Sequence, residues 1–131
     1  MEHGSTSMKT PLGRVRGLGS ARSGTTTFWH QRLTSIAAIP LTIAFIIIVI
    51  SLIGRNHAAA VQILGSPLVA ILMLLFIITT VYHMWIGMQE IIVDYVHDEL
   101  MRYVAILVNT FFSIVVAFAC TYAILKLSFG V

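Results

Sequence analysis

One segment of this chain combines residue types that can do chemistry, and it runs from His83 to Tyr95. Because an α-helix turns by about 100° per residue, four residues of this segment fall on one helix face. They are His83, Gly87, Glu90 and Asp94. His83 lies within an apolar stretch, whereas Asp94 and Tyr95 mark the polar end of the same helix. An ionisable residue in an apolar layer is costly, which makes His83 a candidate functional residue.

The residue type of His83 leaves three interpretations open: a hydrogen-bonded packing residue, a proton relay or a metal ligand. An imidazole nitrogen can ligate haem iron, and the missing side chain of Gly87 would let a flat macrocycle lie close to the backbone. One histidine does not complete a six-coordinate iron, so this interpretation requires a second chain. The sequence contains no paired Cys/His metal motif, no phosphate-binding glycine loop and no serine-histidine-acid set.

The composition excludes a soluble domain. The 131 residues are 58% hydrophobic and 10% charged, and the mean hydropathy is +0.94, whereas a soluble domain carries about 25% charged residues. Cys120 is the single cysteine, so a disulfide framework is excluded. The net charge of +3 comes from basic residues gathered before the first apolar run, where they act as a topology signal and not as a nucleic-acid patch.

Hydropathy predicts an all-α membrane protein with three transmembrane helices that form part of a heteromeric helix bundle. The helices are expected at about 31–53, 67–93 and 101–126, within one membrane domain over 28–131. A polar arm, 1–27, precedes them and is expected to be disordered or ordered by a partner. A transit peptide is the alternative for this arm, because arginine and serine are frequent and acidic residues scarce.

The Lys and Arg residues near the spans are distributed unevenly. Those placed at the N-terminal side or in the second loop are Lys9, Arg14, Arg16, Arg22, Arg32 and Arg102, against Arg55 and Lys126 on the other side. This asymmetry predicts that the N-terminus and the second loop face the cytoplasm or matrix. Arg32 itself has two interpretations, a flank residue that snorkels to the surface or a cation of a binding pocket.

The joint spacing of these residues resembles that of the hydrophobic membrane anchor subunits of succinate dehydrogenase, respiratory complex II. The family pattern is a histidine, a glycine four residues later, and an Asp-Tyr pair eleven and twelve residues after the histidine, which His83, Gly87, Asp94 and Tyr95 match. Before the first span, Gly24, Phe28, Arg32 and Thr34 stand as in bacterial members. The resemblance covers about residues 20–130.

The resemblance implies roles for this chain's residues. His83 would be the axial ligand of haem b, with a second histidine supplied by the cytochrome b subunit, and Arg32 would lie near the haem propionates. Gly87 would also belong to the cofactor-binding residues. Tyr95 would hydrogen-bond ubiquinone, and Asp94 would belong to the polar, proton-relaying surroundings of that site. Electrons would arrive from the iron–sulfur subunit, fed by the flavoprotein subunit, so this chain carries no succinate-oxidising site.

Other interpretations compete with this one. A purely structural membrane anchor needs neither haem nor quinone contacts, and therefore needs neither His83 nor Tyr95. A small transporter subunit could use His83 and Glu90 as a proton relay, although the family motif requires no acid at Glu90. The sequence also leaves open the direction of the reaction, and whether the membrane is a bacterial inner membrane or a mitochondrial one.

Overall fold

The computed structural model describes residues 10–17 and 23–130, and all regular secondary structure in this part of the chain is α-helical. The helices are α1 (Pro11–Val15), α2 (Ser23–Leu52), α3 (His57–Leu64), α4 (Pro67–Tyr95) and α5 (Glu99–Phe129). Three of them, α2, α4 and α5, are long and apolar enough to cross a membrane. The prediction of an all-α membrane protein with three transmembrane helices is confirmed.

The ends of α4 and α5 follow local signals in the sequence. Pro67 occupies the first turn of α4 after Ser66, where its missing N–H costs nothing. The Asp98 carboxylate accepts a hydrogen bond from the Met101 backbone N–H at 2.9 Å and caps α5. Gly130 ends α5 with a φ of 68°, in the left-handed region that favours glycine. The expected spans 67–93 and 101–126 lie inside these two helices.

Two parts of the chain differ from the sequence-based expectation. Helix α2 begins at Ser23, inside the segment 1–27 that was expected to be a polar arm; most of that segment, including Lys9 and Arg22, lies outside the described residues. Hydropathy marks only the apolar part of a helix, whereas backbone hydrogen bonding continues through polar residues. The short helix α3 was not predicted, and His57 is its exposed first residue.

Helix α3 is held at both ends. The Asn56 side chain accepts a hydrogen bond from the Ala59 backbone N–H at 2.9 Å, which satisfies an otherwise unpaired donor at the start of the helix. At its other end, a Cβ on Gly65 would lie 3.1 Å from the Leu127 carbonyl oxygen of α5. The backbone of α5 therefore approaches so closely that a larger residue at 65 would force it to move.

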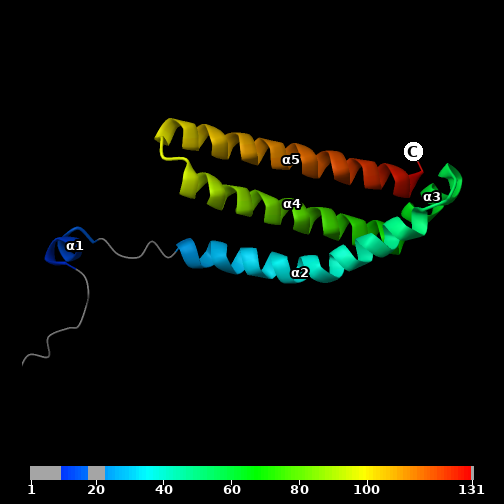
Figure 1. Ribbon diagram of the computed structural model, residues 1–131, viewed down its shortest axis with the longest axis horizontal. Coiled ribbons are helices and arrows are strands. Elements are labelled where there is room, and N and C mark those ends of the chain that lie inside the picture. Colours follow the sequence, from blue (N-terminus) through cyan, green and yellow to red (C-terminus); the bar gives the residue numbers. More distant parts are fainter. Residues whose placement is uncertain (1–9, 18–22, 131) are drawn as a thin grey trace, which may run out of the picture.

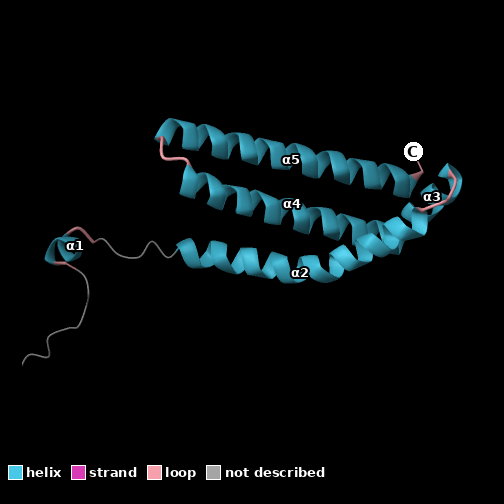
Figure 2. Ribbon diagram, viewed as in Figure 1, coloured by secondary structure: helices cyan, strands magenta, loops and turns pink. Residues whose placement is uncertain are grey.

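The three long helices lie in a row, with α4 between α2 and α5 (Figure 1). The start of α2, the end of α4 and the start of α5 meet at one end, and α3 and the C-terminus lie at the other. Short loops connect α2, α3, α4 and α5 (Figure 2). A row of three helices encloses little interior, and the buried hydrophobic residues of the described part are few: Ile48, Ala70, Ile86, Ile92 and Ile124. The broad apolar faces are thus left for lipid and for other chains.

Helix α2 curves along its length (Figure 1). Pro40 lies in its middle, and a proline there removes one N–H donor and leaves the Ile36 carbonyl without its usual partner four residues on. The curvature of α2 therefore has a local cause in the sequence.

Candidate functional site

His83 lies on the face of α4 that packs against α2. Its Nδ1 is 2.9 Å from the Thr34 hydroxyl oxygen of α2, and the side chain is half-buried. Towards the opposite end of the same helix pair, the rings of Phe45 and Phe76 stack with centroids 4.5 Å apart. These two contacts show that α2 and α4 are antiparallel neighbours. Within the described part of the chain, no hydrogen bond reaches His83 Nε2.

Gly87 follows one turn later and also faces α2. A Cβ at this position would lie 3.5 Å from Nε2 of Gln31, which is ordinary van der Waals contact. The nearest neighbour of Gly87 in this chain is therefore an amide side chain, and it is not so close that only glycine fits. The expectation that the missing side chain serves a macrocycle stays a prediction.

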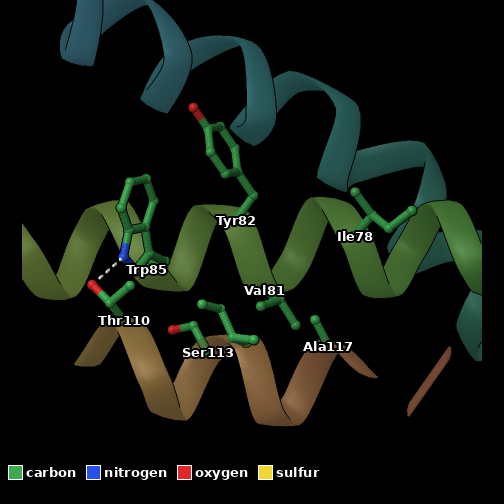
Figure 3. A pocket seen from close by; sticks show the side chains of 8 residues that line it. Ile78, Val81, Tyr82, Trp85, Thr110, Ser113 and Ala117 are labelled. Atoms are coloured by element: carbon green, nitrogen blue, oxygen red, sulfur yellow. Dashed lines mark hydrogen bonds between the residues drawn. The ribbon is translucent and has the colours of Figure 1, made fainter. Parts of the chain in front are cut away.

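A second set of hydrogen bonds, made by neighbours of His83 on α4, connects all three long helices. His30 Nδ1 of α2 is 2.7 Å from the Tyr82 hydroxyl of α4. The Trp85 indole N–H donates to the Thr110 hydroxyl of α5 at 3.1 Å (Figure 3). The Asn109 side-chain amide donates to the Trp85 carbonyl at 3.1 Å. We call His30, Thr34, Tyr82, His83, Trp85, Asn109 and Thr110 the polar layer.

Most of the polar layer was not identified from the sequence. Tyr82, Trp85, Asn109 and Thr110 were not predicted as site residues. Asn109 offered a signal, because a polar amide in the middle of an uncharged span is costly unless it finds a partner. Asn109 is 8% exposed and finds that partner on α4. The hydrogen bonds of the polar layer connect the three long helices at the level of His83 along the bundle.

An apolar pocket of about 350 Å³ opens between α4 and α5 beside the polar layer (Figure 3). Its lining residues are Ile78, Val81, Tyr82, Trp85, Thr110, Ser113, Ile114 and Ala117. The Ser113 hydroxyl is buried, and it has no hydrogen-bond partner in the described chain. The lining carries neither a carboxylate nor a cation, so this pocket suits hydrocarbon and offers no acid–base chemistry.

A more polar pocket of about 420 Å³ lies between α2 and α4 near the α4–α5 loop end, lined by Thr27, Phe28, Gln31, Arg32 and Glu90. The Arg32 guanidinium carbon is 4.5 Å from the centre of the Phe28 ring, a cation–π contact. Arg32 and Glu90 border this pocket without forming an ion pair with each other. Oε1 of Gln31 is buried without a hydrogen-bond partner among the described residues. Arg32 is exposed and borders this pocket, and its two interpretations, flank residue and pocket cation, stay predictions.

Asp94 and Tyr95 are at the C-terminal end of α4, and both are exposed. Tyr95 is twelve residues beyond His83, which corresponds to about 18 Å along the helix axis. The described residues provide no hydrogen-bond partner for the Tyr95 hydroxyl. Among the sequence-predicted residues, His83, Gly87 and Glu90 therefore meet α2 together, whereas Asp94 and Tyr95 stand apart at the end of the bundle.

These residues fit an axial haem ligand better than a metal site made by this chain alone. The described chain contains no group of three or more His, Cys, Asp or Glu that could hold a metal ion. His83 has one ring nitrogen held by Thr34 and the other without a partner, as a single axial ligand requires. The Arg32 guanidinium, two residues before Thr34 on α2, suits an anionic group such as a propionate.

Comparison with known proteins identifies the family. The family model of the succinate dehydrogenase/fumarate reductase transmembrane subunit matches residues 6–117. A succinate dehydrogenase hydrophobic membrane anchor subunit from Paracoccus denitrificans is 31% identical over 121 residues, which cover 92% of this chain and 93% of the relative. A protein of the same description from Rickettsia bellii is 31% identical over 109 residues, covering 80% and 86%. No solved structure gives a significant match. The chain therefore belongs to the family of succinate dehydrogenase and fumarate reductase transmembrane subunits.

Proposed function

We propose that this membrane anchor subunit helps to bind haem b and ubiquinone in a succinate:quinone oxidoreductase, where electrons pass from an iron–sulfur subunit to quinone. The observation that carries the proposal is the environment of His83: Nδ1 is held by Thr34 at 2.9 Å, and Nε2 has no partner within the described chain. A histidine retained only for packing has no need of a free ring nitrogen in an apolar layer.

In this proposal His83 would supply one nitrogen ligand to the haem iron, and a cytochrome b subunit would supply a second ligand. Haem b, when bound, supplies a one-electron carrier within the membrane. Arg32 offers its cation to a propionate from the pocket that it shares with Gln31 and Glu90. Gly87 adds no side chain to the helix face one turn from His83, where the Gln31 side chain is its neighbour in this chain; a flat group could approach the backbone there if the Gln31 side chain moved aside.

Tyr95 and Asp94 are assigned to the quinone. Quinone reduction takes two electrons and two protons, and negative charge develops on the carbonyl oxygens. The Tyr95 hydroxyl has no partner in the described chain and can donate a hydrogen bond to such an oxygen. The exposed Asp94 carboxylate, next to Tyr95 on the chain and in contact with water, can pass protons inward.

Partner subunits are part of the proposal. The row of three helices leaves broad apolar faces uncovered, which supports a second membrane subunit of the cytochrome b type. The iron–sulfur and flavoprotein subunits would dock at the α4–α5 loop end, where Tyr95 is exposed. Both named relatives are bacterial, which supports a bacterial inner membrane as the location.

The haem assignment is tested by His83→Ala in the purified complex, read by the reduced-minus-oxidised optical spectrum and by redox titration. We expect a weakened or shifted b-type spectrum and an altered midpoint potential. His57→Ala is the matched control, because His57 is exposed at the opposite end of the bundle. An unaltered spectrum and potential in His83→Ala would leave the purely structural anchor as the better description.

A further inference from the structure

The hydroxyl oxygen of Thr34 lies at the centre of three close polar contacts. It is 2.8 Å from the His30 carbonyl oxygen, 3.0 Å from the Gln31 carbonyl oxygen and 2.9 Å from His83 Nδ1. The first two contacts are within α2, and the third crosses to α4. A threonine in a helix adopts a rotamer that brings its hydroxyl to the carbonyls three and four residues earlier, so the first two contacts follow from local geometry.

The number of available hydrogens determines whether Thr34 or His83 donates the hydrogen bond between them. A hydroxyl has one hydrogen to donate and two lone pairs to accept with, whereas a carbonyl can only accept. If the Thr34 hydrogen pointed at His83, the hydroxyl oxygen would face two carbonyl oxygens at 2.8 and 3.0 Å with no hydrogen between them. Three acceptor oxygens at such distances repel one another in a low-dielectric layer. The hydrogen therefore points to the carbonyls.

Thr34 then accepts a hydrogen bond from His83, so the ring proton is on Nδ1. In a neutral imidazole the other nitrogen must carry the lone pair. We propose that Thr34 is a positioning residue that holds His83 in the Nδ1–H tautomer, with Nε2 presented as the metal ligand. The proposal rests on the haem role given above, and it adds the residue that sets the tautomer and the ring orientation.

Thr34 acts through His83, so its removal affects the haem without removing a ligand. When the ring nitrogen that does not bind the metal donates its N–H to an acceptor, the ligating nitrogen becomes more basic and rotation of the ring is limited. Loss of this bond should weaken the ligand and destabilise ferric iron relative to ferrous iron. We therefore expect Thr34→Val to move the midpoint potential of the haem to more positive values and to lower haem retention by about 10- to 100-fold.

Three variants distinguish the effect of the Thr34 hydroxyl from the effects of side-chain volume and of the surrounding helix. Valine has the shape of threonine without the oxygen, so Thr34→Val removes the hydrogen bond and keeps the side-chain volume. Thr34→Ser keeps the hydroxyl and should restore the wild-type potential. Ser35→Ala is the matched control on the same helix, because the Ser35 hydroxyl bonds only the Gln31 carbonyl at 2.8 Å and does not reach α4.

The measurements are made on the whole purified complex: the haem-to-protein ratio, the midpoint potential by optical redox titration, and the electron paramagnetic resonance spectrum of the ferric haem. We expect Thr34→Val to show a more positive potential and an altered ferric spectrum, with Thr34→Ser and Ser35→Ala close to wild type. The potential does not depend on yield, so it can be read from whatever fraction of the Thr34→Val complex assembles.

The outcomes distinguish the two proposals. If His83→Ala perturbs the haem but Thr34→Val leaves the potential and the ferric spectrum unchanged, the tautomer assignment is overturned and the haem proposal stands. If His83→Ala also leaves the haem unchanged, both proposals fail. A shift of equal size in Ser35→Ala would trace the effect to the backbone of α2 and would likewise overturn the role of the Thr34 hydroxyl.

Discussion

Tyr95 gives the sharpest test of the quinone assignment, because its hydroxyl makes no hydrogen bond within the described chain. The residue ends α4, and its side chain is 77% exposed. Tyr95→Phe therefore removes an oxygen atom without breaking a contact of this subunit, and we expect assembly and the haem spectrum to remain as in the wild type. If the hydroxyl donates to a quinone oxygen that gains negative charge, its loss should slow quinone reduction by about 10²–10³-fold, or about 2.7–4 kcal/mol.

The assay compares two electron acceptors in the purified complex. Succinate oxidation with a soluble artificial acceptor bypasses the quinone and should be unchanged in Tyr95→Phe, whereas succinate oxidation with ubiquinone should fall. Tyr103→Phe is the matched control, because Tyr103 is also exposed, at 73%, and lies near the start of α5 at the same end of the bundle. Ubiquinone reduction at the wild-type rate in Tyr95→Phe would refute the assignment and make Tyr95 an interfacial belt residue.

Three further predictions concern Gly87, Asn109 of the polar layer and the orientation of the chain in the membrane. Gly87→Ala should leave this subunit folded, because the added Cβ meets only Nε2 of Gln31 at 3.5 Å; a fall in haem content by optical spectroscopy would then report a direct contact, and full retention would remove Gly87 from the site. Asn109→Ala should lower the stability of the detergent-solubilised complex by about 0.6–1.7 kcal/mol in thermal unfolding, since it removes the 3.1 Å bond to the Trp85 carbonyl; an unchanged melting temperature would contradict this. Reporter fusions should place the N-terminus and the α4–α5 loop in the cytoplasm or matrix and the C-terminus opposite; both termini on one side would exclude three crossings.

Hydropathy predicted some of the helix boundaries and missed others. The apolar runs predicted α4 and α5 well, because a membrane requires long uncharged segments with internally satisfied backbones. The start of α2 at Ser23 and the whole of α3 were missed. Both involve polar or short helical segments, for which hydropathy carries no signal. For α3, capping by Asn56 and contact with α5 supply the stability.

The face of α4 that carries the candidate residues could be predicted from the sequence, because residues three and four apart on a helix lie on the same side. His83, Gly87 and Glu90 do meet α2 together. Their partners could not be predicted in this way. Thr34 is 49 residues from His83, and the pairing of these two side chains depends on the axial register between α2 and α4, on which hydropathy has no bearing.

The sequence by itself determined that this chain crosses a membrane with helices, because that follows from the composition and from the length of the apolar runs. It also placed His83, Asp94 and Tyr95 at a spacing that resembles the pattern of succinate dehydrogenase membrane anchor subunits. The tertiary structure decided which groups surround them. It placed Thr34 against Nδ1 of His83 and joined α4 to α5 through Asn109. These are contacts between side chains on different helices, and they exist only once close packing has set the register of the helices.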